Sequence, residues 1–314
     1  MRYKGLGALV LSAVVVSLLP GVALAAKAAV TTGGVSNVTF SSARLNGSVD
    51  ANSTPTIYYF QYGTTVALGT NTAPAAAGRR KNPVHVSTDV GGLRANKRYY
   101  YRIVAQNASG TTLGKRRSFR TRKQPLGVSL AATPNPVAPG VGTTLAGTLA
   151  GTGNAGRRIV LQSNPWPYTQ GFRNASNEQL TTAQGGFSFP LLAVLFNTQY
   201  RVRLPERPAV ASPVVNLGVL FIVHTHVSKH RVRRGRRVRF SGSIFPARSG
   251  AQIAFQKKKS GRWVTVGGTV TGNGGKYRKR VRIRRGGSYR VWAGVVDQQY
   301  TANNGRTVHL RSFR

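Results

Sequence analysis

Arginines recur at every second position near the C-terminus, in the run KYRKRVRIRRGGSYRV at residues 276–291. A guanidinium is a permanently charged, planar fork that can donate to two oxygens of a phosphate or a carboxylate. If this run is a β-strand, residues on one face repeat about every 6.7 Å. One face then has four arginines: Arg278, Arg280, Arg282 and Arg284. The other face has Tyr277, Lys279, Val281 and Ile283, so the spacing predicts a cationic surface above a mostly apolar floor.

A second predicted strand and a lysine run extend this surface. In residues 236–244, Arg237 and Arg239 alternate with Val238 and Phe240, and three lysines precede Trp263 at a predicted hairpin turn. The predicted polyanion-binding residues are therefore Arg237, Arg239, Lys257, Lys258, Arg278, Arg280, Arg282 and Arg284. Two alternatives need no ligand: the charges form a solvated face, or cations at strand edges prevent aggregation between strands.

The N-terminus has the pattern of a secretory signal peptide. Arg2 and Lys4 precede an apolar run that is broken by Pro20 and Gly21, and small residues follow at Ala23 and Ala25. This pattern predicts a signal peptide at residues 1–26 and a secreted, extracellular or cell-envelope protein. The alternative is an uncleaved membrane anchor, because about 20 apolar residues are enough to span a bilayer.

The charge balance indicates an anionic partner. The 314 residues contain 46 Lys and Arg against five acids, which gives a formal net charge of +41. Residues 221–314 contain 23 of these cations and one acid, whereas residues 126–220 contain six cations. Such an excess repels itself unless counterions or a polyanion offset it. A cell-wall polymer or an acidic polysaccharide fits a secreted chain, and the signal peptide makes nucleic acid a less favoured partner.

Catalysis is not expected. The chain has no cysteine, which excludes disulfides, thiolate metal sites and cysteine nucleophiles. Glycoside hydrolysis usually needs two paired carboxylates, and the five acids are scattered. There is no GxSxG motif and no phosphate-cradling loop with a metal-binding acid. The chain is therefore predicted to be no enzyme and to need no cofactor.

Two short motifs resemble functional sites by spacing alone. Gly151, Gly153 and Gly156 satisfy GxGxxG, but a strand-like run follows them where a dinucleotide site needs a helix, so they predict a turn. His224 and His226 would share one face of a strand, with His230 nearby. No cysteine or nearby carboxylate completes a metal site, and the surrounding cations oppose one.

The rest of the chain predicts an all-β fold of three tandem β-sandwiches. Short β-branched and aromatic runs are separated by Gly, Asn, Pro and Ser, and helical spacing is nearly absent after the signal peptide. Residues 27–122 resemble a fibronectin type III domain of secreted bacterial proteins. The matching residues are Tyr62-Gly63, Leu93 with Tyr99, Asn107 with Gly110, and Phe119 with Thr121. Tryptophan is missing from the second strand. The resemblance implies a spacer or adhesive module without catalysis.

Two copies of one unit follow a basic linker at residues 123–126. The predicted units are residues 127–220 and 221–314, and the clearest match is a Tyr-Arg-Val that follows a Gly-Gly pair by 14 residues in each. Both units resemble immunoglobulin-like β-sandwiches. The second copy has Arg236, Arg237 and Arg239 where the first has uncharged residues, so the charge was added to a shared framework.

These observations predict a secreted or cell-surface, non-catalytic binding or adhesion protein. The basic C-terminal unit would attach to an anionic polymer. The main alternative is a purely structural spacer without a specific ligand, and an extracellular enzyme is the least supported.

Overall fold

The computed structural model describes residues 26–314, and the predicted signal peptide lies outside them except for Ala26. Within this range the regular elements are β-strands, apart from one short 3-10 turn, η1 (Asn273–Gly275). The all-β prediction is therefore confirmed. No helix in the described residues is long and apolar enough to span a bilayer. The chain divides into two compact units between Lys123 and Gln124.

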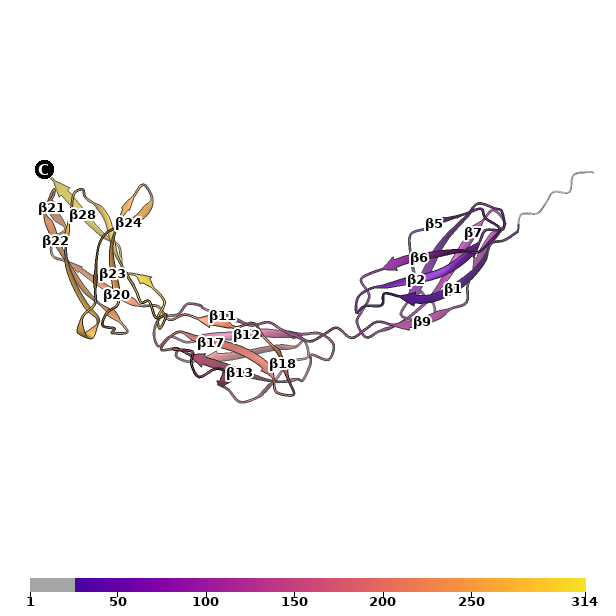
Figure 1. Cartoon of the computed structure of the whole chain (residues 1–314), viewed down its shortest axis with the longest axis horizontal. Helices are drawn as coiled ribbons and strands as arrows, with labels where there is room; N and C mark the ends of the chain where they lie inside the picture. Colours follow the sequence, from indigo (N-terminus) through magenta and orange to yellow (C-terminus); the bar gives the residue numbers. More distant parts are fainter. Residues whose placement is uncertain (1–25) are drawn as a thin grey trace, which may run out of the picture. The chain divides into compact units, whose positions relative to one another are not determined.

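The first unit is a sandwich of two antiparallel sheets (Figure 1). Its strands are β1 (Ala29–Ser36), β2 (Ala43–Asp50), β3 (Thr56–Gly63), β4 (Thr70–Asn71), β5 (Ala75–Gly78), β6 (Val84–Val90), β7 (Arg98–Asn107), β8 (Gly110–Leu113) and β9 (Arg117–Arg120). One sheet has the order β1-β2-β6, and the other has β4-β3-β7-β8 with β5 on β3 and β9 on β7. In β2, every second side chain is buried, because alternation turns Leu45 and Val49 into the core.

A tyrosine closes the corner before β7, as the fibronectin-like sequence pattern predicts. The Tyr99 hydroxyl accepts a hydrogen bond from the Arg94 amide at 2.9 Å, and Leu93 is buried beside this corner. The Tyr99 ring stacks on Phe119 with ring centroids 5.7 Å apart. The corner thereby joins β9 to the start of β7 around one apolar cluster.

The first half of the second unit has its own pair of sheets. Its strands are β10 (Gly127–Val128), β11 (Ala131–Thr133), β12 (Thr143–Ala150), β13 (Arg158–Pro165), β14 (Arg173–Asn174), β15 (Gln179–Leu180), β16 (Gly186–Leu191), β17 (Thr198–Leu204), β18 (Arg207–Ala211) and β19 (Val215–Leu217). One sheet contains β10-β12-β11 with β16 beside β12. The other contains β14-β13-β17-β18 with β15 and β19 on its flanks, and the buried cluster includes Leu145, Leu161 and Val202.

The second half repeats this plan with more charge on its surface. Its strands are β20 (Ile222–Val227), β21 (Arg231–Arg233), β22 (Arg237–Phe245), β23 (Gln252–Lys259), β24 (Arg262–Val270), β25 (Lys276–Arg282), β26 (Gly287–Gly294), β27 (Asn303–Asn304) and β28 (Val308–Phe313). The sheets are β20-β22-β25 and β21-β28-β26-β23-β24, with β27 beside β26. All pairs are antiparallel except β21 with β28.

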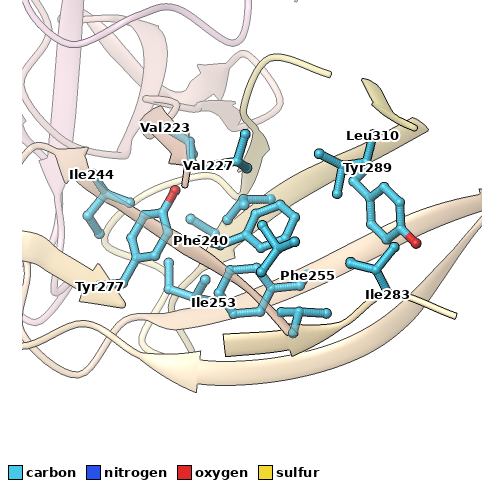
Figure 2. Packing of buried hydrophobic residues seen from close by; sticks show 14 of the residues in the cluster. Val223, Val227, Phe240, Ile244, Ile253, Phe255, Tyr277, Ile283, Tyr289 and Leu310 are labelled. Atoms are coloured by element: carbon cyan, nitrogen blue, oxygen red, sulfur yellow. The ribbon is translucent and has the colours of Figure 1, made fainter. Parts of the chain in front are cut away.

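An aromatic row fills the core of this half (Figure 2). Phe240 and Phe255 meet edge to face at 5.4 Å between ring centroids. Tyr277 lies 6.1 Å from Phe255, and Tyr289 lies 6.1 Å from Phe240. Tyr277 and Tyr289 therefore occupy opposite ends of the cluster, and each points its hydroxyl to a backbone carbonyl, of His224 and Arg285 respectively.

All three sandwiches share a cross-strand pair of glutamine and arginine. The arginine Nε donates to the glutamine Oε1 at 2.8–2.9 Å in Arg102–Gln61, Arg201–Gln162 and Arg290–Gln256. Each arginine follows a buried tyrosine. The Tyr-Arg-Val that the last two units share in sequence contains this arginine, and the structure shows the same pair in the first unit.

A contact region joins the two halves of the second unit. Tyr300 packs against both buried clusters and lies 4.9 Å from the Phe221 ring. The Asn197 side chain accepts from the Val219 amide at 2.6 Å and donates to the Gln298 carbonyl at 2.8 Å. The predicted domain boundary between residues 220 and 221 crosses this region and stays a prediction, since residues 124–314 form one compact unit.

Replacing Gly242 by alanine is expected to destabilise the last sandwich by more than about 2 kcal/mol, because overpacked cores resist added atoms. A Cβ there would lie 1.9 Å from the His224 carbonyl oxygen and 2.7 Å from the Tyr277 hydroxyl. Urea unfolding followed by tryptophan fluorescence measures the loss, because Trp263 and Trp292 both lie in this sandwich. The control is Gly267→Ala, whose Cβ meets nothing closer than 3.9 Å. Equal effects of the two changes would contradict this packing.

Burial raises the pKa of Tyr277 to about 12, whereas its hydrogen bond with Thr225 acts in the opposite direction. The unfolded chain therefore loses this proton at lower pH than the folded chain, and stability falls as pH rises above the unfolded value. Between about pH 9 and about pH 11 the Tyr277 contribution should fall by roughly 1 kcal/mol. The stability difference between the wild-type chain and Tyr277→Phe measures it. A difference that stays constant over this pH range would show that Tyr277 ionises normally.

Candidate functional site

Pairing of β22 with β25 places the predicted arginines side by side. Arg237 lies opposite Arg282, Arg239 opposite Arg280, and Ser241 opposite Arg278. All five arginines are exposed, whereas Val238, Phe240, Tyr277 and Val281 are buried. The predicted alternation is therefore confirmed. Arg237, Arg239, Arg278, Arg280 and Arg282 are called the arginine face below.

Lys279 departs from the predicted apolar floor. It lies opposite the buried Phe240 in register, yet its side chain is exposed. The reason is the position of β25 at the edge of its sheet. A long lysine stem on an edge strand can cover apolar surface and still bring its ammonium group to water.

The arginine face has no acid of its own to neutralise it. Like charges directly opposite each other on neighbouring strands are destabilising. Asp297 is the only acid in residues 221–314, and it pairs with Arg248. The other ion pairs in the described residues are Arg44–Asp89, Arg157–Glu206 and Arg158–Glu178, in the first two sandwiches. The framework therefore tolerates an unfavourable arrangement at this surface.

An open hollow of about 600 Å³ adjoins the arginine face. Its lining is Lys257, Lys259, Val266, Arg282, Arg284, Arg285 and Tyr289, and it is called the basic hollow below. Lys257 comes from the other sheet, and its Nζ donates to the Arg285 carbonyl at 2.8 Å and lies 5.5 Å from the centre of the Tyr289 ring. Burial lowers the pKa of Lys257, and the charges of Lys259 and Arg285 lower it further.

The structure brings together seven of the eight predicted site residues and separates one. Five form the arginine face, and Lys257 and Arg284 join Arg282 in the basic hollow. Lys258, on β23, lies opposite Trp263 of β24 and does not line the basic hollow. Alternation along β23 explains this, because Lys257 and Lys259 point to one side and Lys258 to the other.

Sequence analysis missed Lys259 and Arg285 as site residues. For Lys259 a signal was available, because it lies two positions from Lys257 in a predicted strand. Arg285 follows the end of β25, where period-two spacing no longer applies. Its position depends on its carbonyl, which also accepts from the Tyr289 hydroxyl at 2.9 Å.

The histidines and the glycine motif form no site in the described residues. His224 and His226 are exposed on β20, as their spacing predicts, but residues 26–314 contain no group of three metal-ligating side chains. Gly151, Gly153 and Gly156 have φ angles of 111°, 76° and 62°. They turn the chain between β12 and β13, which confirms the predicted turn.

Comparisons with known proteins add structural neighbours only. No family model matches the chain, and no curated protein matches it in sequence. One similar solved structure is a tetra-tandem repeat in the extending region of a large adhesion protein, with 16% identity over 90% of this chain and 74% of that chain and a TM-score of 0.30. A second is the FN1–FN3 domains of chicken CNTN1, with 14% identity over 90% of this chain and 99% of that chain and a TM-score of 0.27. A third is domains A168–A170 from titin, with 13% identity over 90% of this chain and 99% of that chain and a TM-score of 0.37.

Removing one arginine of an opposed pair is expected to stabilise the fold at low salt. Arg280→Ser relieves repulsion from Arg239, which should raise the free energy of unfolding by about 0.2–1 kcal/mol. The gain should shrink at high salt, because mobile ions screen exposed charges. Urea unfolding at two salt concentrations measures it. The control is Arg306→Ser, which removes one exposed charge outside the strands. An equal gain in both variants would mean that net charge, rather than the opposed pair, is responsible.

Proposed function

We propose that this chain is a secreted or cell-surface, non-catalytic binding protein that attaches to an anionic polymer through residues 221–314. The polymer is a cell-wall polymer or an acidic polysaccharide. The single observation behind the proposal is the arginine face, in which arginines oppose arginines across β22 and β25 with no carboxylate to pair with them. A polyanion laid along these strands offsets the repulsion.

The chemistry of the arginine face suits repeated anionic groups. Each cation near an anionic surface contributes about 1 kcal/mol, so several contacts give useful affinity at low and moderate salt. The guanidiniums can bind phosphate, sulfate or carboxylate oxygens in pairs. Arg282 is partly oriented already, because its Nε donates to the Gly235 carbonyl at 3.0 Å.

The neighbouring sandwich supports a role beyond folding for these charges. There, β12 pairs with β16 as β22 pairs with β25, and Leu145 lies opposite Phe189 in the core. The outward positions of that pair include Thr144, Ala146 and Ser188, which are uncharged. The same framework therefore folds without arginines on this face.

A spacer without a ligand is the second candidate function, and the edge strands favour it. β24 and β25 are both at sheet edges, and exposed cations such as Arg262 and Lys279 protect such edges from pairing with other chains. Nucleic acid fits less well, because single strands stack their bases on exposed aromatic rings and the two tyrosines nearest the arginines are buried. Tyr277 and Tyr289 are only 4% and 2% exposed.

The test is retention of the full chain on heparin resin and on immobilised anionic wall polymer in a salt gradient. Changing Arg278, Arg280, Arg282 and Arg284 to serine should move elution to clearly lower salt, because at least four charge contacts are lost. The matched control changes four exposed cations of the first unit, Arg79, Arg80, Lys81 and Arg94, to serine. The control should elute close to the wild-type chain.

Equal shifts for both variants would reject the proposal in favour of a spacer with diffuse charge. If the four-serine variant loses more retention on DNA-cellulose than on either anionic polymer, nucleic acid is instead supported as the partner. Circular dichroism of each variant checks that the sandwiches remain folded.

A further inference from the structure

The basic hollow differs from the arginine face in geometry. The arginine face is a pair of strands with cations at regular intervals, whereas the basic hollow surrounds one volume with five cations from both sheets and the turn after β25. Val266 and Tyr289 also line it. No carboxylate or histidine lines it.

The turn that completes the basic hollow is fixed by hydrogen bonds. The Arg285 carbonyl accepts from the Tyr289 hydroxyl at 2.9 Å and from Lys257 Nζ at 2.8 Å. The next amide, of Gly286, donates to Ser312 Oγ at 2.8 Å. Since Tyr289 is buried in the core, this anchor fixes the positions from which Arg284 and Arg285 extend. Such preorganisation lowers the entropy that binding costs.

Lys257 is suited to bind a ligand in the basic hollow. An ammonium group has three N–H donors, and the Arg285 carbonyl takes one of them. The group is half-buried and faces the cations of Lys259 and Arg285, so its charge is compensated only by the carbonyl and the Tyr289 ring. An anion inside the basic hollow would supply the missing charge.

We infer that the basic hollow binds one phosphomonoester group, such as a terminal or pendant phosphate of an anionic polymer. A phosphomonoester has a charge of about −1.5 to −2 at neutral pH and three acceptor oxygens, whereas a diester, a sulfate ester or a carboxylate has a single negative charge. Five cations around one volume favour the ligand of highest charge density. The inference rests on the proposed function, because it names the group that the same sandwich recognises in its polymer.

Calorimetric titration of the full chain with glycerol phosphate tests the inference, with dimethyl phosphate, methyl sulfate and acetate as comparison ligands. Glycerol phosphate should bind in one-to-one stoichiometry and at least about tenfold more tightly than the other three. Lys259→Gln and Arg284→Gln alter exposed side chains of the basic hollow, and each should weaken the affinity for glycerol phosphate about tenfold. The double variant Arg239→Ser/Arg280→Ser changes residues outside the basic hollow and should change the affinity for glycerol phosphate less than about twofold.

The same variants separate this inference from the proposed function. The Arg239→Ser/Arg280→Ser chain should lose part of its retention and elute from anionic resin at lower salt, while it keeps its affinity for glycerol phosphate. Loss of neither property in that chain would contradict the proposed function and leave the basic hollow as a separate site. Equal binding of dimethyl phosphate or methyl sulfate would overturn the inference. Unchanged glycerol phosphate affinity in Lys259→Gln and Arg284→Gln would also overturn it.

Discussion

The register between β22 and β25 is the constraint on which the cationic surface depends. Val238 lies opposite Val281, and Gly242 opposite Tyr277, so the buried residues of the two strands meet on the core side. Period two then turns Arg237, Arg239, Arg280 and Arg282 outward as opposed pairs. A shift of one residue would bury arginines, which is far more costly than the repulsion between exposed ones. Core packing therefore maintains a surface arrangement that electrostatics alone would disfavour.

The three sandwiches share a framework and differ in what is displayed on it. Each has a glutamine–arginine pair across two central strands, and each has a glycine where a Cβ would come within about 3 Å of a backbone carbonyl, at Gly47, Gly147 and Gly242. In the last two, the arginine also lies over an aromatic ring, with Arg201 4.2 Å from the centre of Phe172 and Arg290 4.3 Å from the centre of Trp263. The shared glutamine–arginine pairs are part-buried, whereas the arginines that only the last sandwich has on β22 and β25 are exposed.

Much of the fold and part of the candidate site follow from the sequence because they are local in origin. Alternation of Val and Ile with Arg predicted the exposed arginines, and Leu93 with Tyr99 predicted the corner of the first unit. The basic hollow could not be predicted, because it requires knowing that β23 pairs with β26 in the opposite sheet. That long-range pairing brings Lys257 and Lys259 to Arg284 and Arg285 and separates Lys258 from them. The hydrogen bond between Gln61 and Arg102 in the first unit could not be predicted either, because the two residues come together only through the pairing of β3 with β7.

Tyr300 has a consequence for how residues 124–314 unfold. Its ring belongs to both apolar clusters, and Asn197 binds backbone and side chain on either side of it. Melting of one sandwich would expose apolar surface of the other, so the two should lose structure in a single cooperative transition. Residues 124–314 would accordingly unfold at one denaturant midpoint rather than at two.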